Sequence, residues 1–127
     1  MTGHSVKDLN VYKKAYDLAA CIFELSKSFP PEERYALTSQ SRRCSRSVCL
    51  NLREAWAKRR YADHFINKLT DCDGENSETD SCLDFAKHCG YITTRQHKHC
   101  VELCIEIGKM LGAMMARPEK FLLTSDR

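Results

Sequence analysis

Apolar and polar positions divide the chain into four stretches with helical spacing. In each stretch the apolar residues return every three or four positions, and no run alternates apolar and polar residues as a strand does. We therefore expect four helices, over about residues 8–28, 38–60, 63–89 and 94–117. The expected buried faces are, in chain order, Tyr12, Ala15, Tyr16, Ala19, Ile22 and Phe23; Cys44, Val48, Leu52, Ala55 and Trp56; Phe65, Leu69, Cys72, Asn76, Thr79, Leu83 and Ala86; and Val101, Cys104, Ile105, Gly108, Leu111 and Met115.

Helix start and stop signals separate these stretches. Two prolines follow Phe29, Gly90 supplies a stop after the third stretch, and Pro118 ends the fourth. Thr93 and Gln96 have the spacing of a capping box. Ser5 or Asp8 is the expected N-cap of the first helix, and Thr38 that of the second. Mostly short connections between helices of about 20 residues predict one all-α domain over residues 1–127, an antiparallel up-and-down four-helix bundle.

The third helix has a weak segment at residues 71–81, where Cys72 is the one apolar residue. Gly74 inside a helix costs about 1 kcal/mol relative to Ala. The alternating four-three spacing nevertheless continues through the segment, so we expect one unbroken helix. Asn76 and Thr79 then occupy buried seam positions and need hydrogen-bond partners.

Composition and length indicate a globular protein of the cytoplasm. The chain has 127 residues, of which 43% are hydrophobic and 29% charged, with few Gly and Pro. Its uncharged runs are too short to span a bilayer, and its first residues lack the pattern of a secretory signal. The eight cysteines mostly replace small apolar residues within helices, so we expect reduced, buried thiols instead of disulfides.

Charge alternates strongly along the chain. Residues 34–60 hold eight basic residues and one acidic residue, a net charge of +7, whereas residues 61–90 have a net charge of −5. On a helical wheel, Arg42, Arg46, Arg53 and Arg60 fall within about 40°, with Arg43 beside them, and form a band about 27 Å long. Guanidinium groups in a row suit the phosphate backbone of a nucleic acid. The candidate nucleic-acid-binding residues are Arg42, Arg43, Arg46, Arg53, Lys58, Arg59 and Arg60.

An alternative use of these charges is assembly. The basic second helix is joined to the acidic third helix by a short turn near Tyr61, so the two helices can pair with each other or across subunits. Ion pairs of this kind set orientation and partner choice more than stability. The protein would then be an interaction scaffold that does not bind nucleic acid.

A third alternative is a metal-dependent or thiol enzyme, which few features of the sequence support. The motifs of serine hydrolases, P-loop enzymes and zinc proteases are absent, and the spacing around Gly74 does not fit a calcium loop. His97, Cys100 and Cys104 share one helix, near His88 and Cys89, and a zinc site could draw on them, but no paired Cys or His module is present. We expect no enzyme activity, no cofactor and no bound metal.

Three groups of residues resemble a known family. They are Arg34-Tyr35-Ala36-Leu37-Thr38-Ser39-Gln40, the pair Arg42-Arg43, and Ser47-Val48-Cys49-Leu50-Asn51-Leu52-Arg53-Glu54-Ala55. The opening Leu9-Asn10-Val11-Tyr12-Lys13-Lys14-Ala15, and Gly74, Glu78, Leu83, Ala86 and Gly90-Tyr91-Ile92, continue the match. Nearly the whole chain is similar to the four-helix-bundle family that includes the 23S rRNA intervening-sequence proteins and is related to accessory proteins of diversity-generating retroelements.

This resemblance implies an antiparallel bundle that assembles into a homopentameric ring and has no established enzyme activity. In the retroelement relatives a basic surface of the pentamer binds nucleic acid and a reverse transcriptase, so both are expected partners. Three departures lie in the second helix: Cys49 stands where the family usually has Pro, Ala55 where it has Gly, and Arg53 where it has a small residue. Arg53 extends the basic stripe beyond the family pattern.

A polar cluster is also expected inside the bundle. Asn51 and Glu54 border the apolar face of the second helix, and Glu78 borders that of the third. We predict that these three side chains meet near the middle of the bundle, satisfy Asn76 or Thr79, and fix the register of the helices.

Overall fold

The computed structural model describes residues 5–123. The predicted domain of residues 1–127 extends beyond this range at both ends, and the sequence start used in the signal-peptide argument lies partly outside it. Short 3₁₀ turns at Val6–Asp8, Pro31–Glu33 and Pro118–Lys120 accompany the main helices. These helices are α1 (Asn10–Ser26), α2 (Leu37–Ala57), α3 (Ala62–His88) and α4 (Thr94–Ala116).

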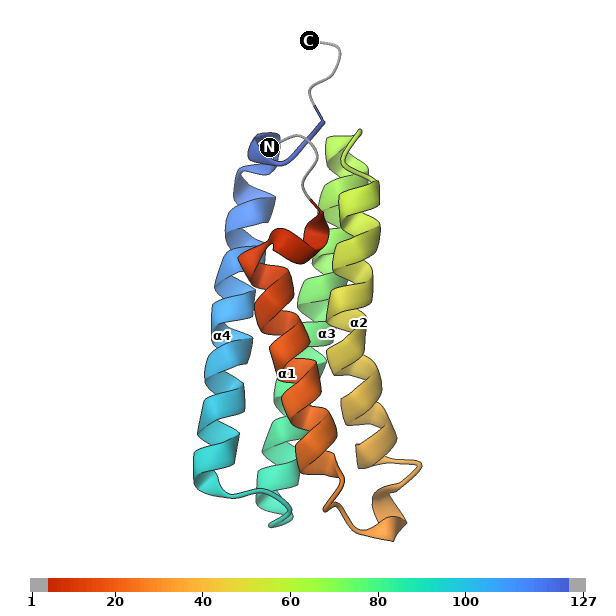
Figure 1. Ribbon diagram of the computed structural model, residues 1–127, viewed down its shortest axis with the longest axis vertical. Coiled ribbons are helices and arrows are strands. Elements are labelled where there is room, and N and C mark those ends of the chain that lie inside the picture. The colour runs from red at the N-terminus through yellow and green to blue at the C-terminus, as the bar shows by residue number, and fades with distance from the viewer. Residues whose placement is uncertain (1–4, 124–127) are drawn as a thin grey trace.

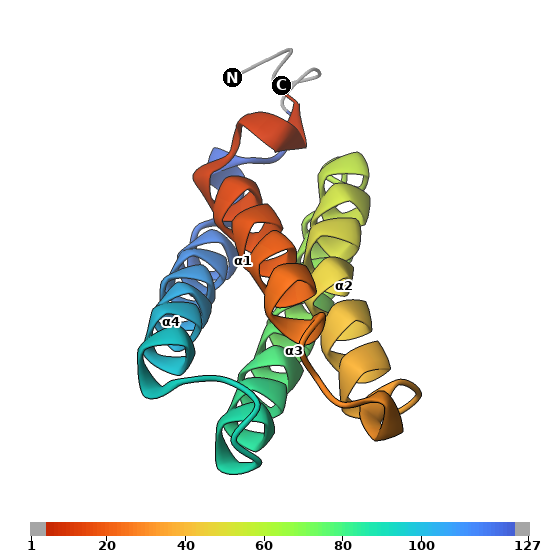
Figure 2. The same ribbon diagram turned by 60° about the horizontal axis from the view of Figure 1, so that its bottom comes forward.

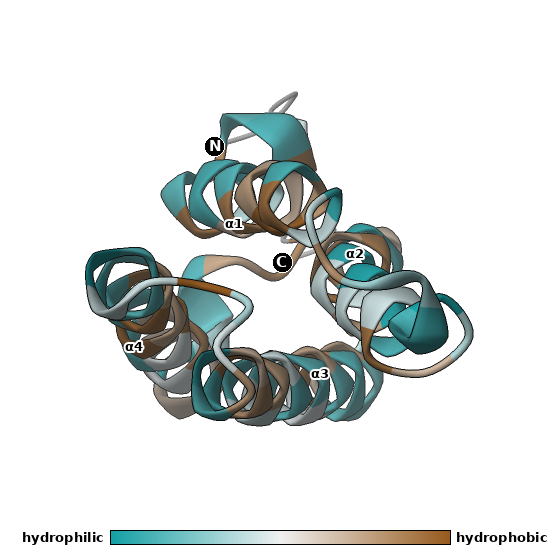
Figure 3. Cartoon of the chain, turned by 90° about the horizontal axis from the view of Figure 1, so that it is seen from below, coloured by the Kyte–Doolittle hydropathy of each residue, from teal (hydrophilic) through white to brown (hydrophobic). Residues whose placement is uncertain are grey.

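The four helices run alternately down and up and form an antiparallel bundle (Figure 1). The α1–α2 and α3–α4 connections lie together at one end, which Figure 2 brings forward, and the α2–α3 turn lies at the other end. Each helix packs against the next along the chain, and α4 packs against α1, so that the helices occupy the corners of a square (Figure 3). The predicted all-α, up-and-down bundle is confirmed.

The core confirms the expected faces of α2 and α3 and adds Ser41, Ser45, Cys49 and Cys82 to them. All five residues predicted for α2 and all seven predicted for α3 are buried, including Asn76 and Thr79. The α3 helix continues through Gly74 without a break. Asn76 Nδ2 donates to the carbonyl of Cys104 at 2.9 Å, and the Thr79 hydroxyl donates to the Glu75 carbonyl at 2.8 Å, so both seam residues have partners.

The predicted faces of α1 and α4 are rotated from the observed ones. In α1, Leu18 and Ile22 are buried, whereas Tyr16 is 61% and Phe23 36% exposed. In α4, Ile107 is buried and Ile105 is exposed. Both helices carry apolar residues on more than one side, so periodicity alone allows two orientations, and packing against two neighbours selects one.

Helix ends differ from the predictions mainly in α2. This helix begins at Leu37, where the carboxylate of Glu33, and not Thr38, accepts the first backbone N–H at 3.1 Å. It ends at Ala57, so the predicted end at residue 60 is wrong. The N-cap of α1 is Leu9, without a side-chain bond, whereas Ser5 caps the 3₁₀ turn before it. Two end signals later in the chain behave as expected. Gly90 has a φ of +78° after α3, and Thr93 and Gln96 form both bonds of the capping box.

Candidate nucleic-acid interface

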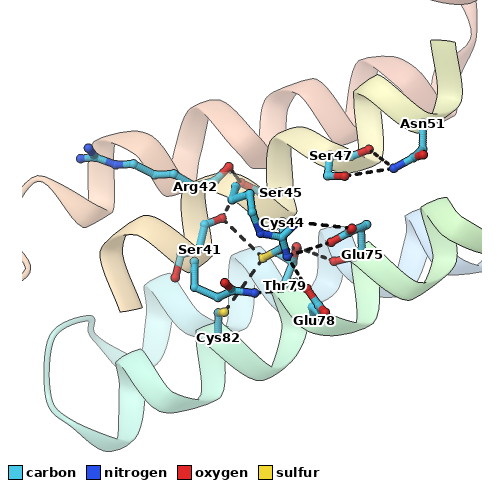
Figure 4. Close-up of polar contacts among 12 residues, drawn as sticks. Ser41, Arg42, Cys44, Ser45, Ser47, Asn51, Glu75, Glu78, Thr79 and Cys82 are labelled. Carbon is cyan, nitrogen blue, oxygen red and sulfur yellow. Dashed lines mark hydrogen bonds and ion pairs between the residues drawn. The ribbon is translucent and has the colours of Figure 1, made fainter. Parts of the chain in front are cut away.

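The outer face of α2 carries three arginines of the predicted stripe. Arg42 is half-buried and Arg46 and Arg53 are exposed. The guanidinium of Arg42 lies 4.7 Å and that of Arg46 5.7 Å from the ring centre of Phe23 in α1. Figure 4 shows Arg42 reaching away from the contact between α2 and α3. Within residues 5–123, none of these three arginines lies within ion-pair distance of a carboxylate.

The stripe is shorter than predicted because α2 ends early. Arg60 lies in the turn after Ala57 and therefore does not continue the helical row. From Arg42 to Arg53 the row extends about 16 Å along the helix axis, instead of the expected 27 Å. Lys58 and Arg60 are exposed in that turn and place two further positive charges beyond Arg53, at the end of the bundle where α2 meets α3.

Arg59 packs inward. Its guanidinium stacks 3.8 Å from the Trp56 ring centre, and its Nε donates to the Trp56 carbonyl at 2.8 Å. A further bond of 3.5 Å reaches the carbonyl of Phe121, and burial lowers the pKa of Arg59. The side chain therefore holds the end of α2 against the segment that follows α4.

Arg43 points to the acidic helix. Its guanidinium lies 2.7 Å from Glu78 and 3.3 Å from Glu75, and these bonds cross from α2 to α3 (Figure 4). The hydrogen bond to Glu75 is the main cause that raises the pKa of Arg43. Of the seven predicted cations, Arg43 alone is paired with carboxylates in the part of the chain that the structure describes.

The structure does not bring the predicted polar cluster together. The Asn51 amide donates to the carbonyl and hydroxyl of Ser47, one turn back in the same helix (Figure 4). Glu54 pairs with Lys68 at 3.0 Å. Glu78 binds Arg43, at a different level of the α2–α3 contact. Asn76 and Thr79 instead donate to the backbone carbonyls of Cys104 and Glu75, and the Thr79 hydroxyl also lies 3.3 Å from Cys44 Sγ.

Two of the residues considered for zinc have other contacts. His97 Nε2 lies 2.7 Å from Asp84, and Cys100 Sγ lies 3.5 Å from Cys21 Sγ. Across residues 5–123, no three His, Cys, Asp or Glu side chains are grouped so that they could hold a metal ion. All eight cysteines are free thiols.

The aromatic residues beside the stripe are the part of this site that sequence reasoning missed. Phe23 and Tyr16 were expected in the core, yet they border the arginines on the outside of the bundle. One signal was available in the sequence: α1 has more apolar residues than a single buried face can hold.

Comparison with known proteins agrees with this architecture. The sequence model of the 23S rRNA-intervening sequence protein family matches residues 7–113, which include all of α1, α2 and α3 and most of α4. The chain belongs to this family. No curated protein matches this member of the 23S rRNA-intervening sequence protein family.

A solved structure has the same fold as this family member. It is the 1.70 Å crystal structure of a protein with unknown function from the S23 ribosomal protein family of Bacteroides thetaiotaomicron. The two chains share 29% identity and superimpose with a TM-score of 0.75, over 84% of this chain and 95% of the other. Among residues 5–123 of this chain, no helix has the length and apolarity needed to cross a membrane.

Proposed function

We propose that this protein is a non-enzymatic, oligomeric protein of the cytoplasm that binds the phosphate backbone of a nucleic acid through the basic face of α2. Its assembly would be the homopentameric ring that the family resemblance implies, and its partner an enzyme of nucleic-acid metabolism such as a reverse transcriptase. The backbone is the expected target because no base-reading helix or strand distinguishes this face.

The observation that supports this function is that three arginines of the stripe have no ion pair with a described carboxylate. Arg42, Arg46 and Arg53 have no carboxylate partner among residues 5–123, although a helix with seven acidic residues nearby follows α2 in the chain. Cations already held in ion pairs lose their attraction for a polyanion, whereas these arginines keep it. Lys58 and Arg60 add to the same positive field.

The test is the salt dependence of binding for an Arg46→Gln/Arg53→Gln variant. Each neutralised phosphate contributes about 0.7 to the slope of log K against log salt for a single strand, and about 0.9 for B-form DNA. Loss of two contacts therefore reduces the magnitude of the slope by about 1.4 to 1.8. A control variant, Arg95→Gln/Lys98→Gln, removes the same charge from exposed positions of α4 and leaves the slope unchanged. Equal slopes for the wild type and the α2 variant would refute the proposal.

The second candidate function is the interaction scaffold, and the Arg43 contacts favour it. Arg43 with Glu75 and Glu78, and Glu54 with Lys68, show that the basic and acidic helices pair across their shared contact. A scaffold predicts that the Arg46→Gln/Arg53→Gln variant changes the subunit number in light scattering, while neither protein binds nucleic acid.

A further inference from the structure

A groove with aromatic walls lies between α1 and α2, beside the basic stripe. Tyr12, Tyr16 and Phe23 line it from α1, and Arg46 and Leu50 from α2, around a volume of about 410 Å³. Tyr16 is 61% and Leu50 62% exposed, so the groove is open in the subunit. The rings of Tyr12 and Tyr16 lie 6.3 Å apart at an angle of 30° and form a continuous aromatic surface.

One end of this groove carries a cluster of cations held by a single ring. Lys27 Nζ lies 5.0 Å, Arg42 4.7 Å and Arg46 5.7 Å from the centre of Phe23. Each cation is attracted to the π-face of the Phe23 ring, and this attraction holds the three like charges close together. The Ser26 hydroxyl accepts from Arg42 Nε at 2.8 Å and fixes that guanidinium. Glu24 is the one carboxylate paired with the cluster in the described residues, at 3.1 Å from Lys27, so the cluster retains a net positive charge and suits an anion.

We propose that the groove binds the unpaired bases of a single-stranded nucleic acid, with a base stacked on Tyr16 and a phosphate at the Lys27, Arg42 and Arg46 cluster. This inference rests on the proposed function and specifies its ligand. Every base has a π-face, so stacking on an aromatic ring is independent of sequence. A duplex keeps its bases stacked inside and offers only its backbone to the groove, so the groove favours single strands over duplexes.

Charge favours this ligand over a second copy of the chain. A second copy would have to bring carboxylates to the cluster, and α3 is the acidic surface that it offers. Four of the seven acids of that helix are already engaged within the subunit, so only three remain for such a contact among the described residues. They are Glu75 and Glu78 with Arg43, Asp71 with Lys68, and Asp84 with His97. A nucleic acid supplies both components that the groove lacks, a phosphate for the cations and a flat ring for the tyrosines.

The experiment measures fluorescence anisotropy with three labelled probes, an oligouridylate, an oligothymidylate and a DNA duplex, all of equal length. The proteins are the wild type, Tyr16→Ala, Tyr16→Phe and Phe85→Ala. Phe85 is a matched control because it is 63% exposed on the acidic helix. Loss of one stacked base costs about 1–3 kcal/mol, so Tyr16→Ala weakens single-strand binding about 5- to 150-fold. It leaves duplex affinity unchanged, and Tyr16→Phe and Phe85→Ala bind both kinds of probe like the wild type.

The outcomes separate this inference from the function on which it rests. If all probes bind with a steep salt dependence but Tyr16→Ala binds single strands normally, the groove assignment is overturned and the backbone-binding function survives. If no probe binds the wild type, both are overturned. If Tyr16→Ala lowers the subunit number in light scattering at unchanged affinity for every probe, the groove is an interface between copies and the inference is wrong. Thermal melting of each variant verifies that the bundle is intact.

Discussion

Asn76 lies in the buried seam between α3 and α4, and its replacement by Leu is expected to stabilise the protein. The side chain is 5% exposed, and its Oδ1 accepts no hydrogen bond from any residue that the structure describes. Its Nδ2 donates to the carbonyl of Cys104. Leu has the same branch point at Cγ, and Gly108 leaves room opposite, where an added Cβ would still lie 3.7 Å from Nδ2.

The magnitude follows from three contributions. Loss of the bond to Cys104 costs about 1 kcal/mol, although this carbonyl lies inside α4 and keeps its place in the helical hydrogen-bond ladder. Removal of the unpaired Oδ1 recovers about 1–3 kcal/mol of desolvation. Leu also has a higher helix propensity than Asn, by a few tenths of a kcal/mol. The expected net stabilisation is about 0.5–2.5 kcal/mol, or a rise in Tm of about 2–9 °C.

Urea unfolding followed by circular dichroism measures this difference, and Asn76→Asp is the matched control. The carboxylate puts a charge into the seam and an oxygen against the Cys104 carbonyl, so we expect a loss of about 3 kcal/mol or more at pH 7. Burial raises the folded-state pKa of such a carboxyl above its unfolded value near 4. Its penalty is therefore present above the folded pKa and disappears as the pH falls below the unfolded value. If Asn76→Leu lowered the free energy of unfolding by more than 1 kcal/mol, Oδ1 would have a partner and the reasoning would be wrong.

Three further predictions concern the ends of the helices and the titratable groups. Gly90→Ala forces a non-glycine residue to a φ of +78° and is expected to destabilise the bundle by about 1 kcal/mol, visible as a lower urea midpoint; an unchanged midpoint would contradict it. Iodoacetamide at pH 7.5 should label the exposed thiol of Cys89 well before those of Cys100 and Cys104, because burial raises the pKa of the latter two to about 12. Peptide mass spectrometry gives the order of labelling, and equal labelling rates would refute the burial argument. Burial, with a contribution from neighbouring Asp84, raises the pKa of Asp80 above its unfolded value, so ionisation of Asp80 costs stability above the folded pKa. Asp80→Asn should therefore raise Tm at pH 7 and leave it unchanged near pH 3. If the variant and the wild type melted alike at both pH values, the prediction would be wrong.

Periodicity predicted the core well where a helix has one apolar face and poorly where it has two. In α3 the four-three spacing from Phe65 to Ala86 identified seven of the eight buried residues, including Asn76 and Thr79, and missed Cys82. In α1 the tyrosines and Phe23 formed a second apolar row, and the orientation depends on contacts with α2 and α4. Such contacts join residues far apart in the chain, and the spacing of apolar residues within one helix does not predict them.

The site residues show the same difference between local and long-range information. Charge alone identified the cations of α2, but it did not predict which group each of them contacts. A guanidinium pairs only with a group that its own side of the helix faces. Arg43 faces α3 and meets Glu75 and Glu78, whereas Arg42, one residue earlier, faces α1 and meets Phe23 and Ser26. Likewise, the Asn51 amide found its partner at Ser47, within its own helix, instead of across the bundle.

This division of the arginines explains why the opposite charges of α2 and α3 do not cancel. A +7 segment beside a −5 segment would leave a net charge of only +2 if every charge lay at the shared contact. The bundle instead turns Arg42 and Arg46 toward α1, whose contribution at that point is an aromatic ring, and a ring holds cations without neutralising them. The subunit therefore keeps a positive face along α1 and α2, whereas Asp63 and Asp73 of α3 have no ion pair with any residue among 5–123. A dipolar surface of this kind attracts a polyanion to one side and repels it from the other, which orients the encounter before any specific contact forms.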